Sequence, residues 1–321
     1  MNAIREIKPN AKVAIVESGA ILEKIHQAVD EHDLVFPLLF GARGSAMIGG
    51  NLSTNAGGSN VLRYGNTRDL CLGIEVVLAD GRVMNLMSEL RKDNTGLNLK
   101  NIFIGAEGTL GIITAAVLRL HPKPLAYVTA MVGLKDLTES LSLLNRLQNE
   151  TGGSVEAFEF MPRRYIERHL EKKEGSSEPF SEPHDVNILL EVATTRASDL
   201  EQDDDGTPKL RSIVETALMD MIEDGSAQDA VIAQNESQRR TMWERREAYA
   251  EITLGIPGSI DTDIAVPLDK VPAFLAQVSS RVKEIDPTGE ELYISHLGDG
   301  NLHYTFDPTD TSGLLKEPIT E

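Results

Sequence analysis

Residues 41–69 read GARGSAMIGGNLSTNAGGSNVLRYGNTRD, and a second glycine-rich stretch, GAEGTLGI, spans residues 105–112. Neither contains the G-x-G-x-x-G or G-x-x-x-x-G-K-[ST] pattern of the two common nucleotide-binding loops. Glycines at this density let the backbone approach a flat or phosphorylated ligand closely and present its N–H groups to that ligand. Tight turns in a β-rich region have the same composition, so the stretch alone leaves both interpretations open.

The composition indicates an ordinary globular chain. Its 321 residues, 41% hydrophobic and 25% charged, are enough for two domains with separate cores. A net charge of −19 argues against nucleic acid or an anionic membrane surface as a partner. Cys71 is the only cysteine, which excludes an internal disulfide and a cysteine-based metal cluster. Without a signal-peptide core or an apolar run of membrane-spanning length, the sequence predicts a reducing, cytoplasmic setting.

Hydrophobic periodicity predicts an α+β chain that divides after Pro122 and Pro124. The first domain, 1–124, is β-rich, with a strand at 11–18, a helix at 20–33 and a hairpin at 71–86 that turns at Asp80-Gly81. The second domain, 125–321, alternates strands and helices, which predicts an antiparallel sheet with helices on one face. Its clearest elements are strands at 126–134 and 187–194, a helix at 136–150 and a hairpin at 291–306.

The predicted hairpin carries the motif HLGDGNLH, residues 296–303. This histidine spacing matches neither H-x-x-x-H on a helix nor a zinc-finger pair. Gly298 and Gly300 permit a turn that would let His296 and His303 face each other. Facing neutral imidazoles suit a divalent metal, but hairpin histidines bonded to backbone are the alternative that the spacing alone favours.

The exact residue order of these segments is more specific than their composition. GARGSAMIGGNLSTNAGG, LRYGNTRDLCLGIEVVLADGRV, LRKDNTG and IFIGAEGTLGIIT occur in order, followed by QRRTMWERREAYAE, TDIAVPLDKVPAFL and HLGDGNLH. Together they closely resemble the FAD-linked D-2-hydroxy-acid dehydrogenases, such as D-2-hydroxyglutarate and D-lactate dehydrogenase-like proteins. The resemblance covers nearly the whole chain. It implies a vanillyl-alcohol-oxidase type FAD-binding domain followed by a cap domain over the flavin ring.

The resemblance also implies which residues line the flavin. One wall would come from Ser45, Ile48, Gly49, Gly50, Asn51, Thr54, Asn55, Gly57 and Gly58, and the other from Glu107, Gly108, Gly111 and Ile112. The polar run Arg91, Lys92, Asp93 and Asn94 either faces the same cleft or forms a solvated hairpin tip.

In the resembling family, the two motif histidines bind a metal, so His296 and His303 are expected to hold a divalent ion, zinc by preference. Asn301 would approach the flavin edge, and Arg246 would bind the substrate carboxylate. The ion would lower the pKa of the substrate 2-hydroxyl, and hydride transfer to flavin would give the 2-oxo acid. Electrons would then pass to a quinone, a cytochrome or an electron-transfer flavoprotein. Three further arginines of the same helix, Arg239, Arg240 and Arg245, are expected to be solvated or salt-bridged, and Trp243 to pack.

The chain departs from the family pattern at several places. Ala250 stands where the hydroxyglutarate-specific pattern has threonine, and Asp261 where it has lysine, which favours D-lactate or another simple 2-hydroxy acid. The upstream pyrophosphate loop and a downstream acidic ligand and histidine have no counterpart, so we expect a chain truncated at both ends. A non-catalytic remnant is therefore the main alternative, with a flavin-free metal-binding module ranked after it. A homodimer is the assembly considered.

Overall fold

The computed structural model describes residues 1–253 and 256–312. The chain divides into two compact units, Met1–Leu125 and Ala126–Glu321, which are described separately below. No helix within the described residues combines the length and the apolar character that a membrane crossing requires.

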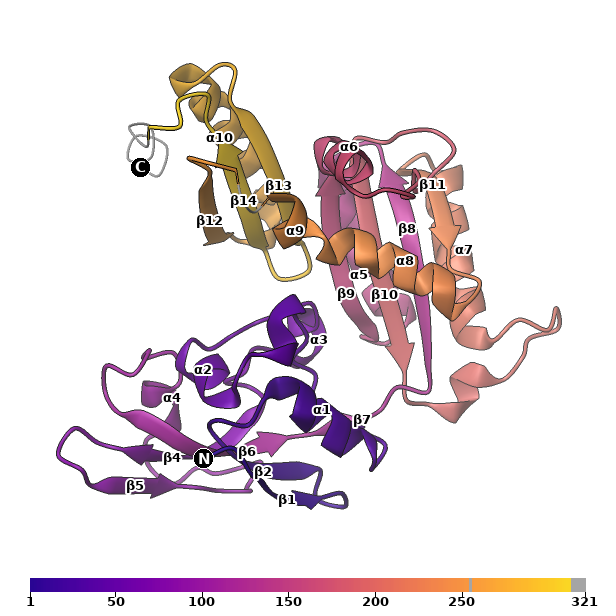
Figure 1. The fold of residues 1–321 in the computed structure, drawn as a ribbon. Helices are drawn as coiled ribbons and strands as arrows, with labels where there is room; N and C mark the ends of the chain where they lie inside the picture. Colours follow the sequence, from indigo (N-terminus) through magenta and orange to yellow (C-terminus); the bar gives the residue numbers. More distant parts are fainter. Residues whose placement is uncertain (254–255, 313–321) are drawn as a thin grey trace. The chain divides into compact units, whose positions relative to one another are not determined.

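The first unit is built on a five-stranded antiparallel sheet, drawn in indigo to magenta in Figure 1. Its order is β1 (Ile4–Lys8), β2 (Val13–Glu17), β6 (Ile112–Arg119), β4 (Cys71–Val77) and β5 (Val83–Leu86). A separate two-stranded sheet pairs β3 (Leu34–Val35) with β7 (His121–Pro122). The predicted 71–86 hairpin is confirmed: Val77 pairs with Val83, and Gly81 between them has a φ of 83°.

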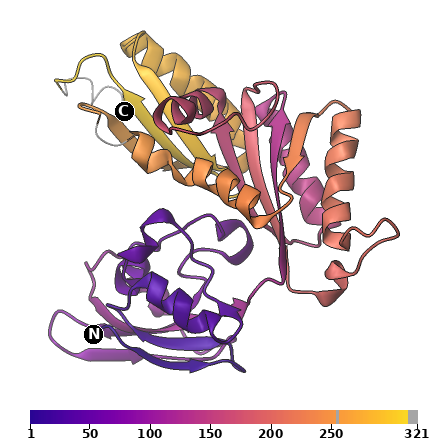
Figure 2. The ribbon, with the colours of Figure 1, turned by 45° about the vertical axis from the view of Figure 1, so that its right-hand side comes forward.

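Short helices cover one face of this sheet (Figures 1 and 2). They are α1 (Leu22–Asp30), α2 (Ile48–Ser53), α3 (Val61–Tyr64) and α4 (Lys100–Phe103), with a 3₁₀ turn at Gly41–Gly44. Helix α1 buries Leu22, Ile25 and Val29, which recur at helical spacing, in the core of this unit. The glycine-rich stretch is therefore partly helical, although its sequence shows no regular period.

The second unit contains a seven-stranded antiparallel sheet, as predicted. Its order is β11 (Ala227–Ile232), β8 (Ala126–Leu134), β10 (Val186–Thr194), β9 (Val155–Pro162), β13 (Glu290–His296), β14 (Asn301–Asp307) and β12 (Ile260–Ala265). Its helices are α5 (Ser140–Glu150), α6 (Arg163–Lys172), α7 (Lys209–Glu223), α8 (Glu236–Glu247), α9 (Tyr249–Thr253) and α10 (Val271–Ile285). The described residues of this unit also form three 3₁₀ turns, Leu137–Glu139, Ala197–Leu200 and Leu268–Lys270.

Helices lie against both faces of this sheet, not against one face as the sequence predicts (Figures 1 and 2). Strands β9 and β10 are buried at every position, which requires cover on both sides. On one face, Tyr165 of α6 and Met242 of α8 pack with Leu189 of β10. On the other face, α5 contacts β9, and α7 contacts β8 and β11.

Strands β13 and β14 form the hairpin that carries the two histidines. His296 pairs with Asn301, and Ile294 pairs with His303. Because directly opposed residues and alternate residues share a face, all four lie on the same side of the sheet. Gly300 closes the turn with a φ of 81°, and a Cβ there would lie 2.1 Å from the carbonyl oxygen of Val266. Only glycine fits that position without a shift of the neighbouring backbone.

We predict that Gly300→Ala destabilises the second unit more than Gly225→Ala does. Both glycines have a φ near 80°, but a Cβ at Gly225 would meet nothing within 4 Å. Gly225→Ala should therefore cost only the left-handed strain, about 1 kcal/mol. Gly300→Ala should cost about 2 kcal/mol more because of the clash with Val266. Urea unfolding of both variants measures the difference, and equal losses would contradict it.

Candidate functional site

The two glycine-rich segments of the first unit meet in the structure. Gly105 N–H donates to the carbonyl of Leu52 over 3.0 Å, and Glu107 N–H donates to the carbonyl of Ser53 over 2.9 Å. Helix α2 and the loop at 105–108 therefore adjoin, although some fifty residues separate them in the sequence. The backbone of Glu107 at this contact is in the left-handed region, with a φ of 51°.

The glycines of these segments serve two different purposes. A Cβ at Gly49 would lie 2.6 Å from the Cβ of Ser18, and one at Gly58 would lie 2.1 Å from the carbonyl oxygen of Leu39. Gly111 is similarly tight, with the side chain of Val76 at 2.7 Å. Protein packing alone explains these three. Gly50 has nothing within 4 Å, and Gly108 has only the tip of Ile112 at 3.9 Å, so these two are open to a ligand.

The side chains near these glycines divide in the same way. Asn55 Oδ1 accepts from the backbone N–H of Arg68, and the hydroxyl of Thr54 donates to the carbonyl of Gly50. Ser45 Oγ lies 3.4 Å from the carbonyl of Ala42. Asn51 differs from these, since it is 4% exposed and its Nδ2 has no hydrogen-bond partner among residues 1–253 and 256–312. A buried donor without an acceptor is costly unless a bound group supplies one.

Three apolar residues complete the description of this region. The side chain of Ile48 lies fully within the core, so only its backbone is left for a ligand, and Gly57 lies against Val61. Ile112, by contrast, is 58% exposed at the start of β6. The orphaned Asn51 amide, the open glycines and this exposed apolar side chain fit the edge and face of a flavin ring.

In the second unit, the structure brings together the two motif histidines. The ring centroids of His296 and His303 are 5.2 Å apart, with the planes at 77°. The turn is held by N–H groups of Asp299 and Gly300 that both donate to the carbonyl of His296. The sequence-based interpretation that the imidazoles face each other across the hairpin is therefore borne out geometrically.

A buried carboxylate from a third strand joins this cluster. Glu159 of β9 has its side chain 1% exposed and accepts from Arg246 Nε at 2.6 Å. His296 Nδ1 lies 2.9 Å from the same carboxylate, and Arg246 Nη2 lies 3.2 Å from His296 Nδ1. Arg246 Nη1 makes no hydrogen bond within the described part of the chain. Glu159 therefore fixes the Nε edge of the guanidinium, and the N–H groups of Nη1 stay available for another acceptor.

Burial and charge set the protonation states here. Burial alone would raise the pKa of the Glu159 carboxyl, but Arg246 and His296 outweigh it and hold that pKa below its ordinary value. Burial lowers the pKa of His303 to about 4, and the neighbouring His296 and Arg246 side chains act in the same direction. His303 is consequently neutral near pH 7 and keeps a nitrogen lone pair.

Strand β12 and helix α9 border the histidines. Asn301 Nδ2 donates to Asp263 Oδ1 over 2.6 Å, so its amide is turned toward β12. Asp263 Oδ1 also lies 3.7 Å from His303 Nδ1. The ring of Tyr249 is 5.9 Å from that of His303, and its hydroxyl bonds Thr305 at 2.7 Å.

The donor set for a metal is incomplete in the described residues. They contain no group of three or more His, Cys, Asp or Glu side chains arranged to hold an ion. His296 and His303 supply two imidazoles, which is too few for a closed zinc site or a three-ligand catalytic one. The chemistry of the pair fits two positions of such a site and no more.

The remaining α8 residues match expectation only in part. Arg239 forms a two-pronged ion pair with Glu191, at 2.7 and 2.8 Å, as the salt-bridge prediction requires. Arg240 is exposed. The expectation for Arg245 was wrong: it is buried and donates to the carbonyl of Ser177 instead of being solvated or salt-bridged. Trp243 does more than pack, because its indole N–H also donates to Glu191.

We predict strong energetic coupling between Glu159 and Arg246. Glu159→Gln leaves a buried guanidinium unpaired, which should cost about 3–5 kcal/mol of unfolding free energy at pH 7. In the double variant Glu159→Gln/Arg246→Met, that unpaired charge is gone. The double variant should be more stable than the sum of the single losses implies, by about 2 kcal/mol. Urea unfolding measures all three variants, and additive losses would show that the two residues do not interact.

Comparison with known families matches both units. Residues 1–87 match the model of an FAD binding domain, and residues 123–313 match the C-terminal domain of FAD linked oxidases. Among solved structures, an alkyldihydroxyacetonephosphate synthase aligns with 100% of the chain and 61% of its own, at a TM-score of 0.69 and 16% identity. A p-cresol methylhydroxylase with substrate bound aligns with 100% of the chain and 66% of its own, at a TM-score of 0.65 and 16% identity.

Curated relatives are similar over most of the chain. A probable mitochondrial D-2-hydroxyglutarate dehydrogenase of Oryza sativa subsp. indica is 37% identical over 94% of the chain and 52% of its own length. The D-2-hydroxyglutarate dehydrogenases of Xanthomonas citri pv. viticola and Stutzerimonas stutzeri are 34% and 33% identical, over 90% and 94% of the chain and 58% and 62% of their own lengths. The chain thus spans about half the length of these relatives. It belongs to the FAD-linked oxidase family of oxidoreductases, with the fold of vanillyl-alcohol-oxidase type flavoproteins.

Proposed function

We propose that the chain takes part in the FAD-dependent oxidation of a D-2-hydroxy acid to the 2-oxo acid. The family and the names of the relatives support this reaction class. The observation that carries the proposal for this chain is the Arg246 guanidinium beside the histidine pair. A fixed cation next to a neutral imidazole is what a substrate with a carboxylate and an adjacent hydroxyl needs.

The residues of the second unit would divide the work between them. Arg246, whose Nη1 makes no hydrogen bond within the described residues, would bind the substrate carboxylate through its remaining N–H donors. Glu159 would hold that guanidinium in one orientation and balance its charge. His303, neutral because burial lowers its pKa to about 4, would keep its single nitrogen lone pair for the ion described below, and the substrate hydroxyl would bind that ion.

The first unit would hold the cofactor. Asn51 Nδ2 would donate to an acceptor on the flavin, and Gly50 and Gly108 would let the backbone approach the ring. Bound FAD supplies the two-electron acceptor chemistry that no amino-acid side chain provides.

A divalent ion, zinc by preference, would be held by His296 and His303. The neutral state of His303 and the 5.2 Å separation of the two rings support this part of the proposal. Further ligands would have to come from outside the described residues or from the substrate itself. The ion would supply positive charge for the substrate oxygens.

The substrate's far end is the less constrained part. Asp261 lies on the same side of the sheet as His303 and accepts from Thr305 Oγ1 at 2.5 Å. A carboxylate there would repel a second carboxylate on the substrate. This favours D-lactate or another monocarboxylate, whereas the names of the relatives favour D-2-hydroxyglutarate.

The electron acceptor, the cytoplasmic location and the homodimer stay predictions, and several relatives are named mitochondrial.

We predict that the purified chain, supplied with FAD, shows flavin absorbance that a D-2-hydroxy acid bleaches without oxygen. Arg246→Met should raise the D-lactate concentration for half-bleaching about tenfold to a hundredfold, because a charge-assisted bond is lost. Arg240→Met is the matched control, since it removes an exposed arginine of the same helix. It should change the D-lactate concentration for half-bleaching less than about twofold.

Several outcomes of that experiment discriminate between the alternatives. A protein that stays colourless with added FAD, or a flavin that neither D-lactate nor D-2-hydroxyglutarate bleaches, would support the non-catalytic remnant. If D-2-hydroxyglutarate half-bleaches the flavin at a lower concentration than D-lactate does, the proposed monocarboxylate preference is wrong, but the proposed reaction class is unaffected.

We predict that Co²⁺, used as a spectroscopic substitute for zinc, binds the chain through His303. His303→Ala should weaken Co²⁺ binding at least about tenfold and change its visible absorption, because a nitrogen ligand is lost. His32→Ala, which removes an exposed histidine of the first unit, is the matched control. Titration is done without substrate or flavin, and equal affinity in the two variants would eliminate the metal assignment.

A further inference from the structure

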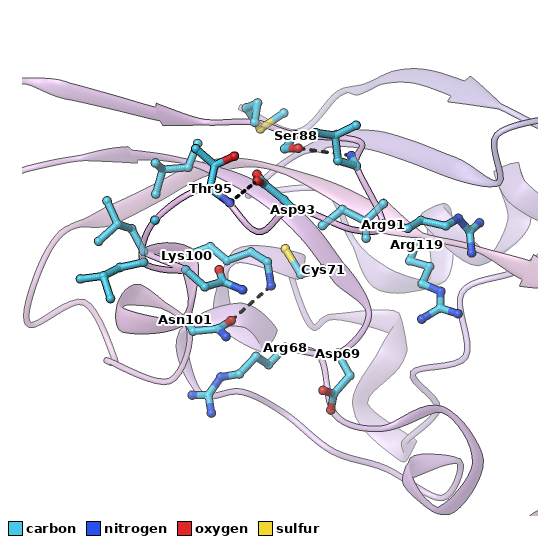
Figure 3. A pocket seen from close by; sticks show the side chains of 18 of the residues that line it. Arg68, Asp69, Cys71, Ser88, Arg91, Asp93, Thr95, Lys100, Asn101 and Arg119 are labelled. Carbon is cyan, nitrogen blue, oxygen red and sulfur yellow. Dashed lines mark hydrogen bonds between the residues drawn. The ribbon is translucent and has the colours of Figure 1, made fainter.

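A cavity of about 650 Å³ lies within the first unit, apart from the open glycines described above. Figure 3 shows it between the end of β5, the loop that follows that strand, and helix α4. Arg91 and Asp93 of the polar run line it, whereas Lys92 and Asn94 do not. The run is thus split between a cavity wall and the outer surface.

The charge of this cavity is opposite to that of the chain. Its lining contains the cations Arg68, Arg91, Lys100 and Arg119 and the carboxylates Asp69 and Asp93, a surplus of two positive charges. The chain as a whole carries −19. Asp69 and Asp93 accept from backbone N–H groups of their own turns, of Asn66 and Thr95. Within the described residues, none of the four cations has an acidic partner within ion-pair distance.

The arginines also keep unused donors. Arg68 Nη2 donates to the carbonyl of Ile104 over 2.7 Å, and Arg91 Nη2 donates to the carbonyl of Ala11 over 3.2 Å. The Nε atoms of Arg68 and Arg119 are buried and have no hydrogen-bond partner in the described part of the chain. Since a guanidinium has five N–H donors and buried ones are normally satisfied, these groups indicate a missing acceptor.

Lys100 lines the cavity from helix α4. Figure 3 shows its ammonium group between Cys71 and Asn101, and Nζ donates to Asn101 Oδ1 over 3.2 Å. Burial raises the pKa of the Cys71 thiol to about 12, and Lys100 opposes that shift only in part. The ammonium is therefore close to the cavity wall and has donors left over.

The cavity walls could contact the apolar part of a ligand as well as its charged groups. Leu72, Leu86, Met87, Leu90, Leu97 and Leu99 line the cavity beside the cations. Leu97 is 83% exposed and Leu90 is 62% exposed, so apolar surface is available to a ligand. The volume lies in the usual range for small-molecule sites.

We propose that this cavity is a binding site for a small organic dianion, a phosphomonoester or a dicarboxylate. Two negative charges match the surplus of two, and oxyanions accept from guanidinium and ammonium donors. The site is independent of the proposed oxidation, because its residues belong neither to the open glycines nor to the histidine cluster. Failure of the flavin reaction leaves it untouched.

The test is isothermal titration of the full chain at low ionic strength, without FAD. The probes are glutarate and glycerol 3-phosphate as dianions and acetate as the monoanion. At least one dianion should bind about tenfold or more tightly than acetate, and the one that does identifies the source of the charge. Lys100→Gln and Arg91→Gln should each weaken that binding about tenfold, since each removes a charge-assisted bond.

Lys92→Gln is the matched control, since it removes the same charge one residue from Arg91 but outside the cavity. It should change the affinity less than about twofold. Equal losses in Lys92→Gln and the two cavity variants would show general electrostatic attraction and overturn the proposal. Absence of dianion binding, or displacement of the dianion by FAD, would overturn it as well. Circular dichroism confirms that each variant is folded. Within the described residues, the Lys100 side chain bonds only the side chain of Asn101, so Lys100→Gln keeps the test valid if Arg91→Gln does not fold.

Discussion

A buried carboxylate organises the second unit. Glu159 lies on β9, Arg246 on α8 and His296 on β13, so a single charge cluster joins two strands and a helix. An isolated carboxylate in that environment would be neutral, because burial disfavours its charged form. Arg246 and His296 keep it ionised, and Glu159 in turn fixes the guanidinium and one imidazole. The relative orientation of Arg246 and the histidine pair depends on this arrangement.

Much of the strand pattern follows from local sequence. The strand at Ala126–Leu134 and the hairpin around Asp80-Gly81 agree with prediction because alternation and turn chemistry act over a few residues. Helix α2 could not be recognised, since two of its six residues are glycines with poor helix propensity. It forms because Gly49 packs against Ser18 and donates to its carbonyl, a contact from a distant part of the sequence.

The site was predictable in part for the same reason. Gly298 and Gly300 predict a turn, and a turn brings His296 and His303 close together. Glu159 gave a weaker signal: it is an ionisable residue within the apolar strand VEAFEFMP, which is buried at every position. A charged residue in such a strand needs a partner, but the partners, Arg246 and His296, are separated from it by 87 and 137 residues. No local pattern identifies them.

The seven-stranded sheet has one junction that differs from the others. Strands β9 and β13 share a single register pair, Ser295 with Phe160, and a further bond from Gly298 N–H to the carbonyl of Phe158. Strands β8 and β10, by comparison, pair along nine positions. Figure 1 shows β13 and β14 diverging from β9. With so few backbone bonds across it, this seam is where amide hydrogens should exchange first, and the Glu159–His296 contact acts there as a side-chain latch.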